Sequence, residues 1–278
     1  MASDWSIKGK VCLVTGANEA LGRETVLNLV KMGAERVIMA CRNMDTGRTA
    51  LDYIKLTLDL RKDGDKRLSL RHLDLSSLEN IRQFVKTISE EEKQLHLLIN
   101  NAGTLTLGRE RELTVDGFEK CFGTNHVGHF YLTNLLMDLM KESAPSRIVM
   151  VSSDFYQATW PWGLNVDDLN FEKVKWFNPA IAYAQSKLAN ILFTRELDRR
   201  LNSTSKGHSG ISVFCVHPGV IHTRLTRNQH WAVKWLSAKF IASLPNTCSI
   251  KEGAKVTLNC ATNPEIEQFS GKYFSQKT

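Results

Sequence analysis

Tyr183 and Lys187 stand four residues apart in the stretch AYAQSKLANIL, which is predicted to be helical. Residues four apart share one face of a helix, so the phenol and the ammonium would be neighbours. A free phenol ionises near pH ~10, and a nearby positive charge stabilises the phenolate. Such a phenol could exchange a proton with a carbonyl or alcohol oxygen. The same spacing is common by chance, and the simpler interpretation is one face of an amphipathic helix.

Other polar residues stand where they could assist such chemistry. Ser152 and Ser153 end an apolar run, where a hydroxyl can hydrogen-bond a substrate oxygen or form a turn. Asn125 opens the segment GTNHVGHFYLTNLL, where its amide would bind water or a backbone carbonyl, or cap a helix. His126 and His129 follow without an evident third ligand, so we expect helix packing and no metal site.

The stretch TGANEALG, from Thr15 to Gly22, follows the apolar run VCLV. Gly16 would let the chain turn off a strand, and Gly22 would let the next helix pack closely with its N-terminus facing an anion. A phosphate-binding loop usually has a further glycine where this sequence has Ala20. We expect the alanine to hinder close approach without excluding it, provided its backbone is not left-handed. By itself the loop is equally compatible with a simple turn.

Polar residues also follow the next three strand-like runs. Arg42 follows the second, where an arginine favours a 2′-phosphate and a carboxylate favours a free ribose hydroxyl. Asp74 follows the third run, and Asn101 lies in the NNAG stretch after the fourth. The alternatives are a surface arginine and a helix-capping aspartate. Together these positions suit one phosphate-rich ligand at a shared sheet edge.

Short apolar runs alternate with longer amphipathic stretches along the chain. The runs are rich in Val, Ile and Leu with little alternation, which is typical of strands covered on both faces. The pattern predicts an α/β fold over residues 1–278: a single-domain doubly wound parallel sheet (Rossmann-type) with helices on both faces. The predicted strands are Val11–Val14, Arg36–Cys41, Leu68–Leu73, Leu95–Asn100, Arg147–Ser152 and Ile211–Val216, and the predicted helices cover 20–32, 44–60, 77–92, 113–140 and 180–201.

Two long connections, 154–179 and 220–248, interrupt this rhythm and are expected to be substrate-side loops. Five of the six tryptophans fall within them, which argues for ordered, apolar segments that roof a pocket. The stretch WAVKWLSAKFIASL at 231–244 places tryptophan and phenylalanine beside lysines. It suits either a shallow contact with a membrane surface or a substrate lid.

Composition narrows the class of protein. The net charge is +7, but no basic stripe or RNA-binding motif accompanies it, so we expect no nucleic-acid partner. The start MASDWSIKGK lacks the apolar run of a signal peptide, and no apolar stretch approaches the roughly 18 residues of a membrane span. We therefore expect a cytoplasmic protein, peripheral at a membrane if 231–244 makes that contact. The six cysteines show no C-x-x-C spacing, and Cys12, Cys41 and Cys215 are expected to be buried thiols.

Taken in order, the motifs TGANEALG, ACR, LDL, NNAG, the Asn125 segment, VSS, YAQSK and HPGVIHT resemble the short-chain dehydrogenase/reductase family. The stretches LLINNAG, NHVGHFYLTNLL and AYAQSKLANILFTREL look most like its retinol dehydrogenase group. They are also similar to the reductase domain of WW-domain-containing oxidoreductases, although this sequence has no WW modules. Ala20 departs from the family, which normally has glycine there.

The resemblance implies a role for each matching residue. Tyr183 would be the general acid/base, Lys187 would bind the nicotinamide ribose and lower the pKa of the tyrosine, Ser153 would orient the substrate oxygen, and Asn125 would hold a proton-relay water. The residues that would contact the cofactor are Gly16, Asn18, Leu21, Gly22, Arg42, Asp74, Asn101, Tyr183, Lys187 and Thr223.

These features predict an oxidoreductase that prefers NADP(H) over NAD(H) and acts on a lipophilic carbonyl or alcohol, such as a retinoid or another aldehyde or ketone. The family is often dimeric, so a homodimer is a further expectation. Two alternatives stay open: a nucleotide-binding scaffold without turnover, which Ala20 would favour, and an adaptor whose tryptophan loops bind protein.

Overall fold

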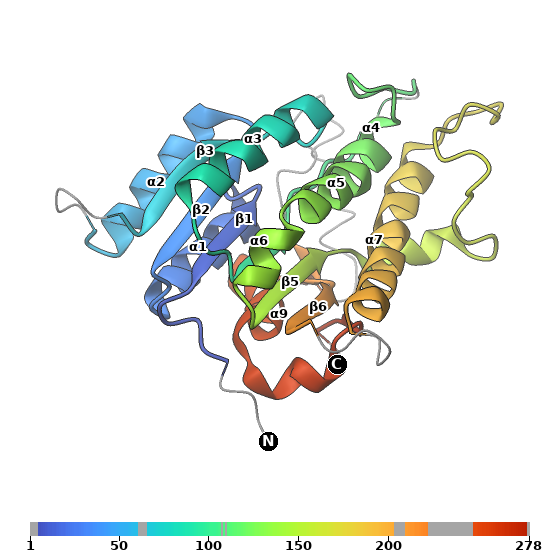
Figure 1. Ribbon diagram of the computed structural model, residues 1–278. Coiled ribbons are helices and arrows are strands. Elements are labelled where there is room, and N and C mark those ends of the chain that lie inside the picture. The colour runs from blue at the N-terminus through green and yellow to red at the C-terminus, as the bar shows by residue number, and fades with distance from the viewer. Residues whose placement is uncertain are drawn as a thin grey trace.

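The computed structural model describes residues 5–60, 66–106, 108, 110–202, 209–221 and 247–276. Within them, seven parallel strands form one sheet in the order β3-β2-β1-β4-β5-β6-β9, and helices cover both of its faces (Figure 1). The strands are β1 (Val11–Thr15), β2 (Arg36–Cys41), β3 (Leu68–His72), β4 (Leu97–Asn100), β5 (Ser146–Val151), β6 (Ile211–Val216) and β9 (Tyr273–Phe274). This arrangement confirms the predicted doubly wound parallel sheet.

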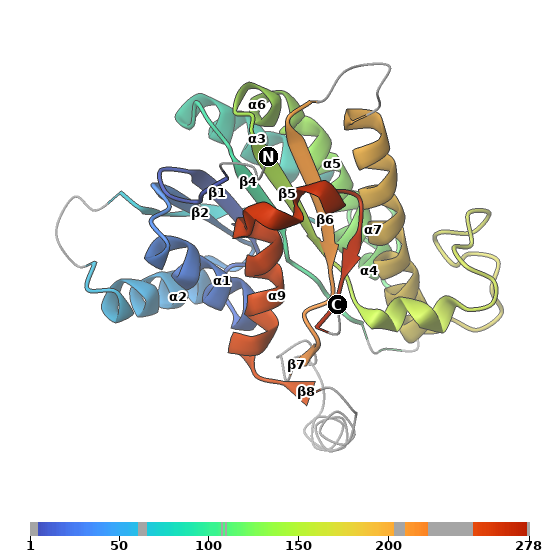
Figure 2. The ribbon, with the colours of Figure 1, turned by 90° about the horizontal axis from the view of Figure 1, so that it is seen from below.

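Strand residues alternate between two hydrophobic cores because side chains along a strand point to opposite faces. In β1, Cys12 and Val14 belong to one core, whereas Val11 and Leu13 belong to the other. The first core lies under α1 (Ala20–Lys31), α2 (Met44–Thr57) and α9 (Ile250–Thr262). The second lies under α3 (Leu78–Glu91), α5 (Gly128–Leu135), α6 (Met137–Glu142) and α7 (Pro179–Leu201), and Figure 2 shows the two layers on either side of the sheet.

The strand order reverses direction between β1 and β4. From β1 the sheet grows through β2 to β3 on one side and through β4 to β5 and β6 on the other. Connections at the carboxyl ends of β1 and β4 therefore diverge, which opens the crevice where ligands bind in open α/β sheets.

The predicted helix over 113–140 is wrong in its first seven residues. Leu113 pairs with Glu119 in an antiparallel bridge, and Gly117 turns the chain between them with φ of +83°. The helical part begins at α4 (Lys120–Phe122), where the Glu119 carboxylate accepts the backbone N–H groups of Cys121 and Phe122. It continues through a π-helical turn, η1 (Gly123–Val127), into α5.

The sequence analysis did not assign the C-terminal elements α9, the 3₁₀ turn η4 (Pro264–Phe269) and β9. A capping box marks the start of α9: Ser249 accepts the Glu252 N–H, and the Glu252 carboxylate accepts the Ser249 N–H. A short parallel pair, β7 (Val220–Ile221) with β8 (Thr247–Cys248), lies before α9.

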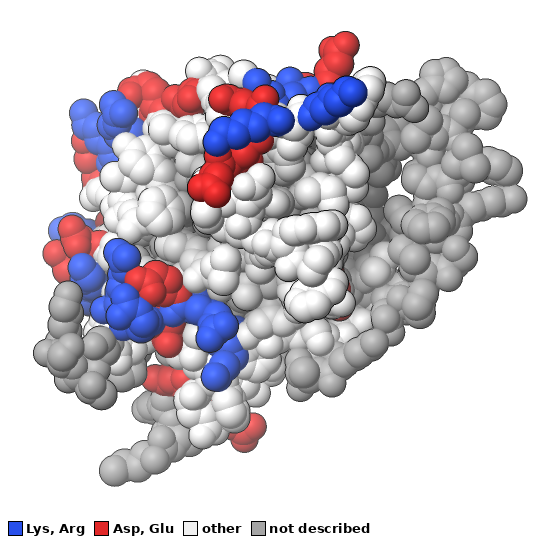
Figure 3. Space-filling view, turned by 90° about the vertical axis from the view of Figure 1, so that its right-hand side faces the viewer, with Lys and Arg blue, Asp and Glu red and all other residues white. Residues whose placement is uncertain are grey.

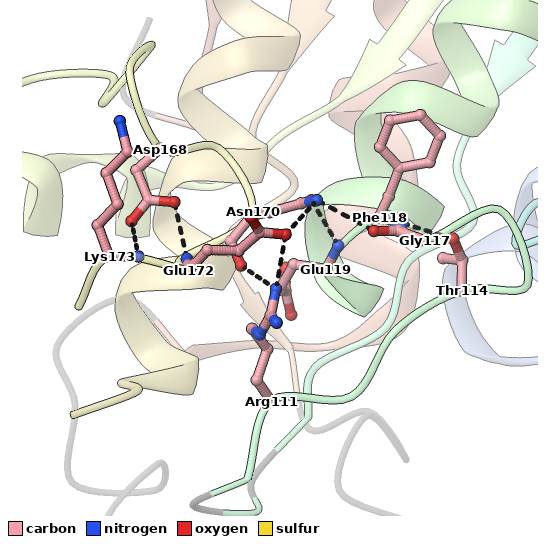
Figure 4. A network of polar contacts seen from close by, with 9 residues as sticks. All are labelled: Arg111, Thr114, Gly117, Phe118, Glu119, Asp168, Asn170, Glu172 and Lys173. Atoms are coloured by element: carbon pink, nitrogen blue, oxygen red, sulfur yellow. Dashed lines mark hydrogen bonds and ion pairs between the residues drawn. The ribbon is translucent and has the colours of Figure 1, made fainter. Parts of the chain in front are cut away.

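The connection after β5 begins with a 3₁₀ turn, η2 (Asp154–Thr159), and then runs without regular structure to α7. A polar network ties its middle to the bridge before α4 (Figure 4). Asn170 accepts the Glu119 N–H at 2.9 Å and donates to the carbonyl of Gly117 at 3.0 Å, while Arg111 donates to the Asn170 carbonyl at 2.9 Å. Asp168 closes the adjoining turn by accepting two backbone N–H groups.

The tryptophans of this connection do not roof a pocket in this structure. Trp160, Trp162 and Trp176 are 80%, 86% and 81% exposed. The segment is ordered as expected, but its polar network holds it while these rings face outward. The other two tryptophans, within 231–244, and Thr223 lie outside the described residues.

Cys12, Cys41 and Cys215 are buried free thiols, as predicted. No helix among the described residues is long and apolar enough to cross a membrane.

Candidate functional site

Tyr183, Lys187 and Ser153 meet beyond the carboxyl end of β5. Tyr183 and Lys187 lie one turn apart on α7, and the Lys187 ammonium lies 5.5 Å from the centroid of the Tyr183 ring. Ser153 follows β5, and its side chain lies near enough to Tyr183 to lower the pKa of the phenol. Lys187 also donates to the carbonyl of Val151 at 3.1 Å. The structure thus brings together the predicted phenol, ammonium and hydroxyl.

Burial dominates the ionisation of this pair. It raises the pKa of Tyr183 to about 12, and the hydrogen bond from Ser153 acts in the opposite direction. Burial lowers the pKa of Lys187 to about 8. The sequence analysis expected the lysine to lower the pKa of the tyrosine. In this structure the net shift has the other sign, because the desolvation of a buried phenolate outweighs its stabilising contacts.

Asn125 lies in the π-helical turn and is fully buried. Its side chain accepts the Thr104 N–H at 2.7 Å and donates to the Thr104 carbonyl at 2.9 Å and to Ser186 Oγ at 3.0 Å. These bonds tie the loop after β4 to α7 beside Lys187. The Asn125 side chain therefore holds the walls of the site together, and its role with a relay water stays a prediction.

The start of α1 packs closely against the loop after β1, where Gly22 approaches Gly16 and Asn101. Gly16 has φ of +63°, in the left-handed region that favours glycine. A Cβ on Gly22 would lie 2.2 Å from the Gly16 carbonyl oxygen and 2.8 Å from Asn101 Nδ2. Asn101 Nδ2 donates to the carbonyl of Thr15 at 2.8 Å. The predicted close packing of the helix is thus present, and Asn101 shapes the loop.

Ala20 departs from the expectation in its backbone. Its φ is +41°, which is left-handed and strained for a residue with a Cβ. The condition under which alanine was expected to be tolerated is therefore not met. The backbone strain lies at the first residue of α1, and a glycine at this position would be unstrained.

Of the other predicted cofactor residues, Asn18 and Leu21 lie in or directly after this loop, and Arg42 and Asp74 follow the next two strands. Asn18 donates to Thr46 Oγ1 at 2.9 Å, which ties the loop to α2, and Leu21 is buried in the core beneath α1. Arg42 is exposed directly after β2. Asp74 accepts the N–H and the hydroxyl of Ser76 after β3, so it forms a turn there.

His129 is a residue whose structural role the sequence analysis missed. It is fully buried, and its Nδ1 lies 2.9 Å from the Asn125 carbonyl oxygen while its Nε2 lies 2.9 Å from Thr15 Oγ1. A carbonyl only accepts, so Nδ1 carries the proton and Nε2 accepts from Thr15. Thr15 Oγ1 in turn accepts the N–H groups of Asn101 and Ala102 at 2.9 Å each. No sequence signal pairs Thr15 with a residue 114 positions later.

His126 packs among aromatic rings on the same helical segment as His129. His126 donates from Nδ1 to Asn190 Oδ1 at 3.0 Å and packs against Phe122, Phe130 and Phe193. Among the residues that the structure describes, no group of three His, Cys, Asp or Glu side chains could hold a metal ion.

The site fits a phosphate-bearing dinucleotide at one specific place. Side chains cap the N-termini of α2, α3, α7 and α9, whereas the N-cap residue of α1 makes no side-chain capping bond. The first amides of a helix need an acceptor, and an anion supplies one. The first turn of α1 contains no acidic residue, although the N-cap residue that precedes it is Glu19.

Comparisons with known proteins agree with this geometry. Residues 10–165 match the model of the short chain dehydrogenase family. Retinol dehydrogenase 11 of Mus musculus is 42% identical over 98% of this chain and 79% of its own length, and retinol dehydrogenase 14 of Homo sapiens is 43% identical over 96% and 78%. A short-chain type dehydrogenase/reductase from Mycobacterium marinum superposes with a TM-score of 0.73 at 19% identity, covering 97% of this chain and 94% of its own. An NADPH-bound carbonyl reductase from chicken fatty liver superposes with a TM-score of 0.68 at 21% identity, covering 97% of each chain. The chain belongs to the short-chain dehydrogenase/reductase family, with retinol dehydrogenases among its homologues.

Proposed function

We propose that this protein is an NADP(H)-dependent oxidoreductase that interconverts a lipophilic carbonyl compound and its alcohol. The observation that carries the proposal is the meeting of Ser153, Tyr183 and Lys187 at the carboxyl end of β5, on the same edge of the parallel sheet as the loop between β1 and α1. The retinol dehydrogenase relatives support a retinoid-like aldehyde or ketone as the substrate class. The NADPH-bound structural neighbour and the exposed Arg42 support the choice of cofactor.

The bound cofactor would supply the hydride, and the protein residues would handle the proton and the substrate oxygen. Tyr183 stays protonated over the physiological range because burial raises its pKa to about 12. It is therefore suited to donate a proton to the oxygen of a carbonyl that is being reduced. Ser153 would hydrogen-bond the same oxygen, and Lys187 would hold the nicotinamide ribose.

The residues that would hold the dinucleotide lie along the crevice. The uncapped amides of α1 would face the pyrophosphate, with Gly16, Asn18, Leu21 and Gly22 shaping that loop. Arg42 would pair with the 2′-phosphate, and Asp74 and Asn101 would lie toward the adenosine. Thr223 remains a proposed contact to the nicotinamide amide.

A screen of NADPH oxidation tests the proposal. The purified protein is incubated with carbonyl compounds of graded chain length and ring size, retinaldehyde among them, and parallel reactions contain NADH. We expect turnover with long or ringed aldehydes and faster rates with NADPH. NADPH binding without oxidation across the panel would favour the alternative of a scaffold without turnover.

We also propose that two copies of the chain associate through α5 and α7. Phe130 and Leu135 on α5 and Leu192 on α7 are 46%, 37% and 42% exposed. Figure 3 views the side of the molecule on which α7 lies, and charged side chains are sparse at the centre of this face. Light scattering after size-exclusion chromatography should give twice the chain mass, and Leu192→Glu should halve it.

A further inference from the structure

Asp154, which directly follows Ser153, is held by two residues from distant parts of the chain. The Tyr273 hydroxyl donates to Asp154 Oδ1 at 2.5 Å. His217 Nε2 lies 3.5 Å from Asp154 Oδ2, so a proton on that nitrogen faces the carboxylate. Tyr273 lies on β9, and His217 follows β6. These contacts join the last strand of the sheet to the first turn after β5.

The Tyr273 backbone is held in position because β9 pairs with β6 in the sheet. Tyr273 aligns with Cys215 in the parallel pair, and the His217 N–H donates to the Phe274 carbonyl at 2.8 Å. The ring of Tyr156 on η2 packs edge-on against the Tyr273 ring at 5.7 Å. Burial raises the pKa of the Tyr273 phenol, and the hydrogen bond to Asp154 adds to this shift, so the phenol stays a donor. Asp154 is thus anchored to a fixed part of the sheet.

The position of Asp154 affects Ser153, the residue directly before it. Ser153 Oγ accepts the Phe155 N–H at 3.2 Å, which leaves the hydroxyl proton free to point elsewhere, and the same side chain lies near enough to Tyr183 to affect its pKa. The Phe155 ring packs at 6.0 Å from the Tyr183 ring. Asp154 stands between Ser153 and Phe155, so its position sets the direction of the turn that both residues belong to.

We propose that Asp154, supported by Tyr273, is a positioning residue for Ser153: it fixes the first turn of η2 and thereby aims the Ser153 hydroxyl at Tyr183. The proposal rests on the proposed function, in which Ser153 binds the substrate oxygen. The carboxylate itself is engaged by Tyr273 and faced by His217, so it acts through Ser153 and not on the substrate. The C-terminal strand, absent from the sequence-based assignment, would in this way complete the site.

The kinetics of matched variants test whether Asp154 affects catalysis through Ser153. Tyr273→Phe removes only the hydroxyl that holds Asp154, and it should lower kcat about tenfold, since a misaligned hydrogen-bond donor loses much of its effect. KM and the Kd for NADPH should stay unchanged, because the loop between β1 and α1 is untouched. Asp154→Ala should show the same loss. In a Ser153→Ala background, Tyr273→Phe should lower kcat no further, since residues that act through one group are not additive.

Tyr131→Phe is the matched control, because its hydroxyl contacts Arg82 on the surface of α3, at 3.4 Å, away from Asp154. It should leave kcat unchanged. An equal loss from Tyr273→Phe in both backgrounds, or no loss in either, would overturn the proposal.

Crystal structures of the wild-type protein and of Tyr273→Phe give a second measurement that does not need turnover. The Ser153 and Tyr183 hydroxyl oxygens should lie farther apart in the variant than in the wild type, and an unchanged separation would contradict the proposal. If the variant does not crystallise, Asp154→Ala serves the same comparison. A wild-type protein without turnover would refute the proposed function alone, while the crystallographic comparison would still decide the role of Asp154.

Discussion

The Lys187 ammonium lies over the Tyr183 ring, 5.5 Å from its centroid, and donates its hydrogen bond to the Val151 carbonyl. The charge is therefore held at the end of β5 by the backbone, beside the phenol. Ser153 acts on the phenol itself and lowers its pKa. The serine and the lysine therefore approach the phenol from different elements, the end of β5 and α7.

Replacing Tyr183 with phenylalanine should remove the proton donor and leave the ring packing in place. We expect kcat to fall about 100- to 10,000-fold, the usual contribution of general acid catalysis. The Kd for NADPH, measured by fluorescence titration, should change less than twofold. A variant with near wild-type kcat would rule out the acid/base role.

Replacing Arg42 with aspartate should shift the cofactor preference toward NADH. The exposed guanidinium would no longer pair with a 2′-phosphate, and a charge-assisted hydrogen bond of that kind contributes about 1.5–3 kcal/mol. The ratio of kcat/KM for NADPH to that for NADH should fall by about tenfold or more. Arg48→Asp is the control, because Arg48 lies on α2 and pairs with Asp45. An equal fall in both variants would point to general charge attraction and away from a specific site.

Replacing Ala20 with glycine should stabilise the protein. A left-handed φ of +41° costs a residue with a Cβ about 1–3 kcal/mol. Glycine avoids this strain, but it also makes the unfolded chain more flexible, which cancels part of the gain in stability. We expect the free energy of unfolding in urea to rise by about 1 kcal/mol, with NADPH binding equal or tighter. Ala50→Gly in the middle of α2 should have the opposite sign, because glycine is unfavourable in a helix interior. Weaker NADPH binding by Ala20→Gly would mean that the alanine contributes to the site.

His129 should make the fold sensitive to acid. Burial lowers its pKa from 6.5 to about 3, so the folded protein keeps it neutral while the unfolded chain binds a proton below pH 6.5. Stability is therefore unaffected by this group at neutral pH and falls as the pH drops from 6.5 toward 3, by about 1.4 kcal/mol per pH unit. Urea unfolding between pH 7 and pH 4.5 should show a smaller slope for His129→Gln than for the wild type.

The exposed His72 provides the matched comparison for this measurement. His72→Gln also removes one histidine but leaves the buried His129 in place, so a smaller slope in His129→Gln alone would assign the effect to the buried residue. Equal slopes for wild type and His129→Gln would show that His129 is protonated as easily in the folded protein as in the unfolded chain.

The sequence predicts the central sheet well because its strands are buried on both faces. Leu13, Ile38 and Ile148 lie in short continuous apolar runs, which are typical of strands covered on both faces. The positions of the candidate residues were predictable for a related reason: Tyr183 and Lys187 are near in sequence, and Ser153 and Asn101 directly follow strands. Local patterns determine both.

The features that were missed depend on distant contacts or on backbone angles. The bridge of Leu113 with Glu119 is stabilised by Asn170, some fifty residues later, so the local sequence looked helical. Strand β9 contains only Tyr273 and Phe274 and exists because β6 offers it a partner. The positive φ of Ala20 runs against the preference of its residue type, and no sequence rule predicts a residue that the fold strains.

The π-helical turn at Gly123–Val127 contains one residue more per turn than its neighbours. Its widened ring lets the Asn125 carbonyl receive His129 Nδ1 at 2.9 Å and Asn190 Nδ2 at 3.2 Å. Deleting a single residue here would restore ordinary helical pitch and close the widened turn that Asn125 occupies. Asn125 would then swing off the wall it shares with Thr104 and Ser186, so the length of this helix is as constrained as the identity of its residues.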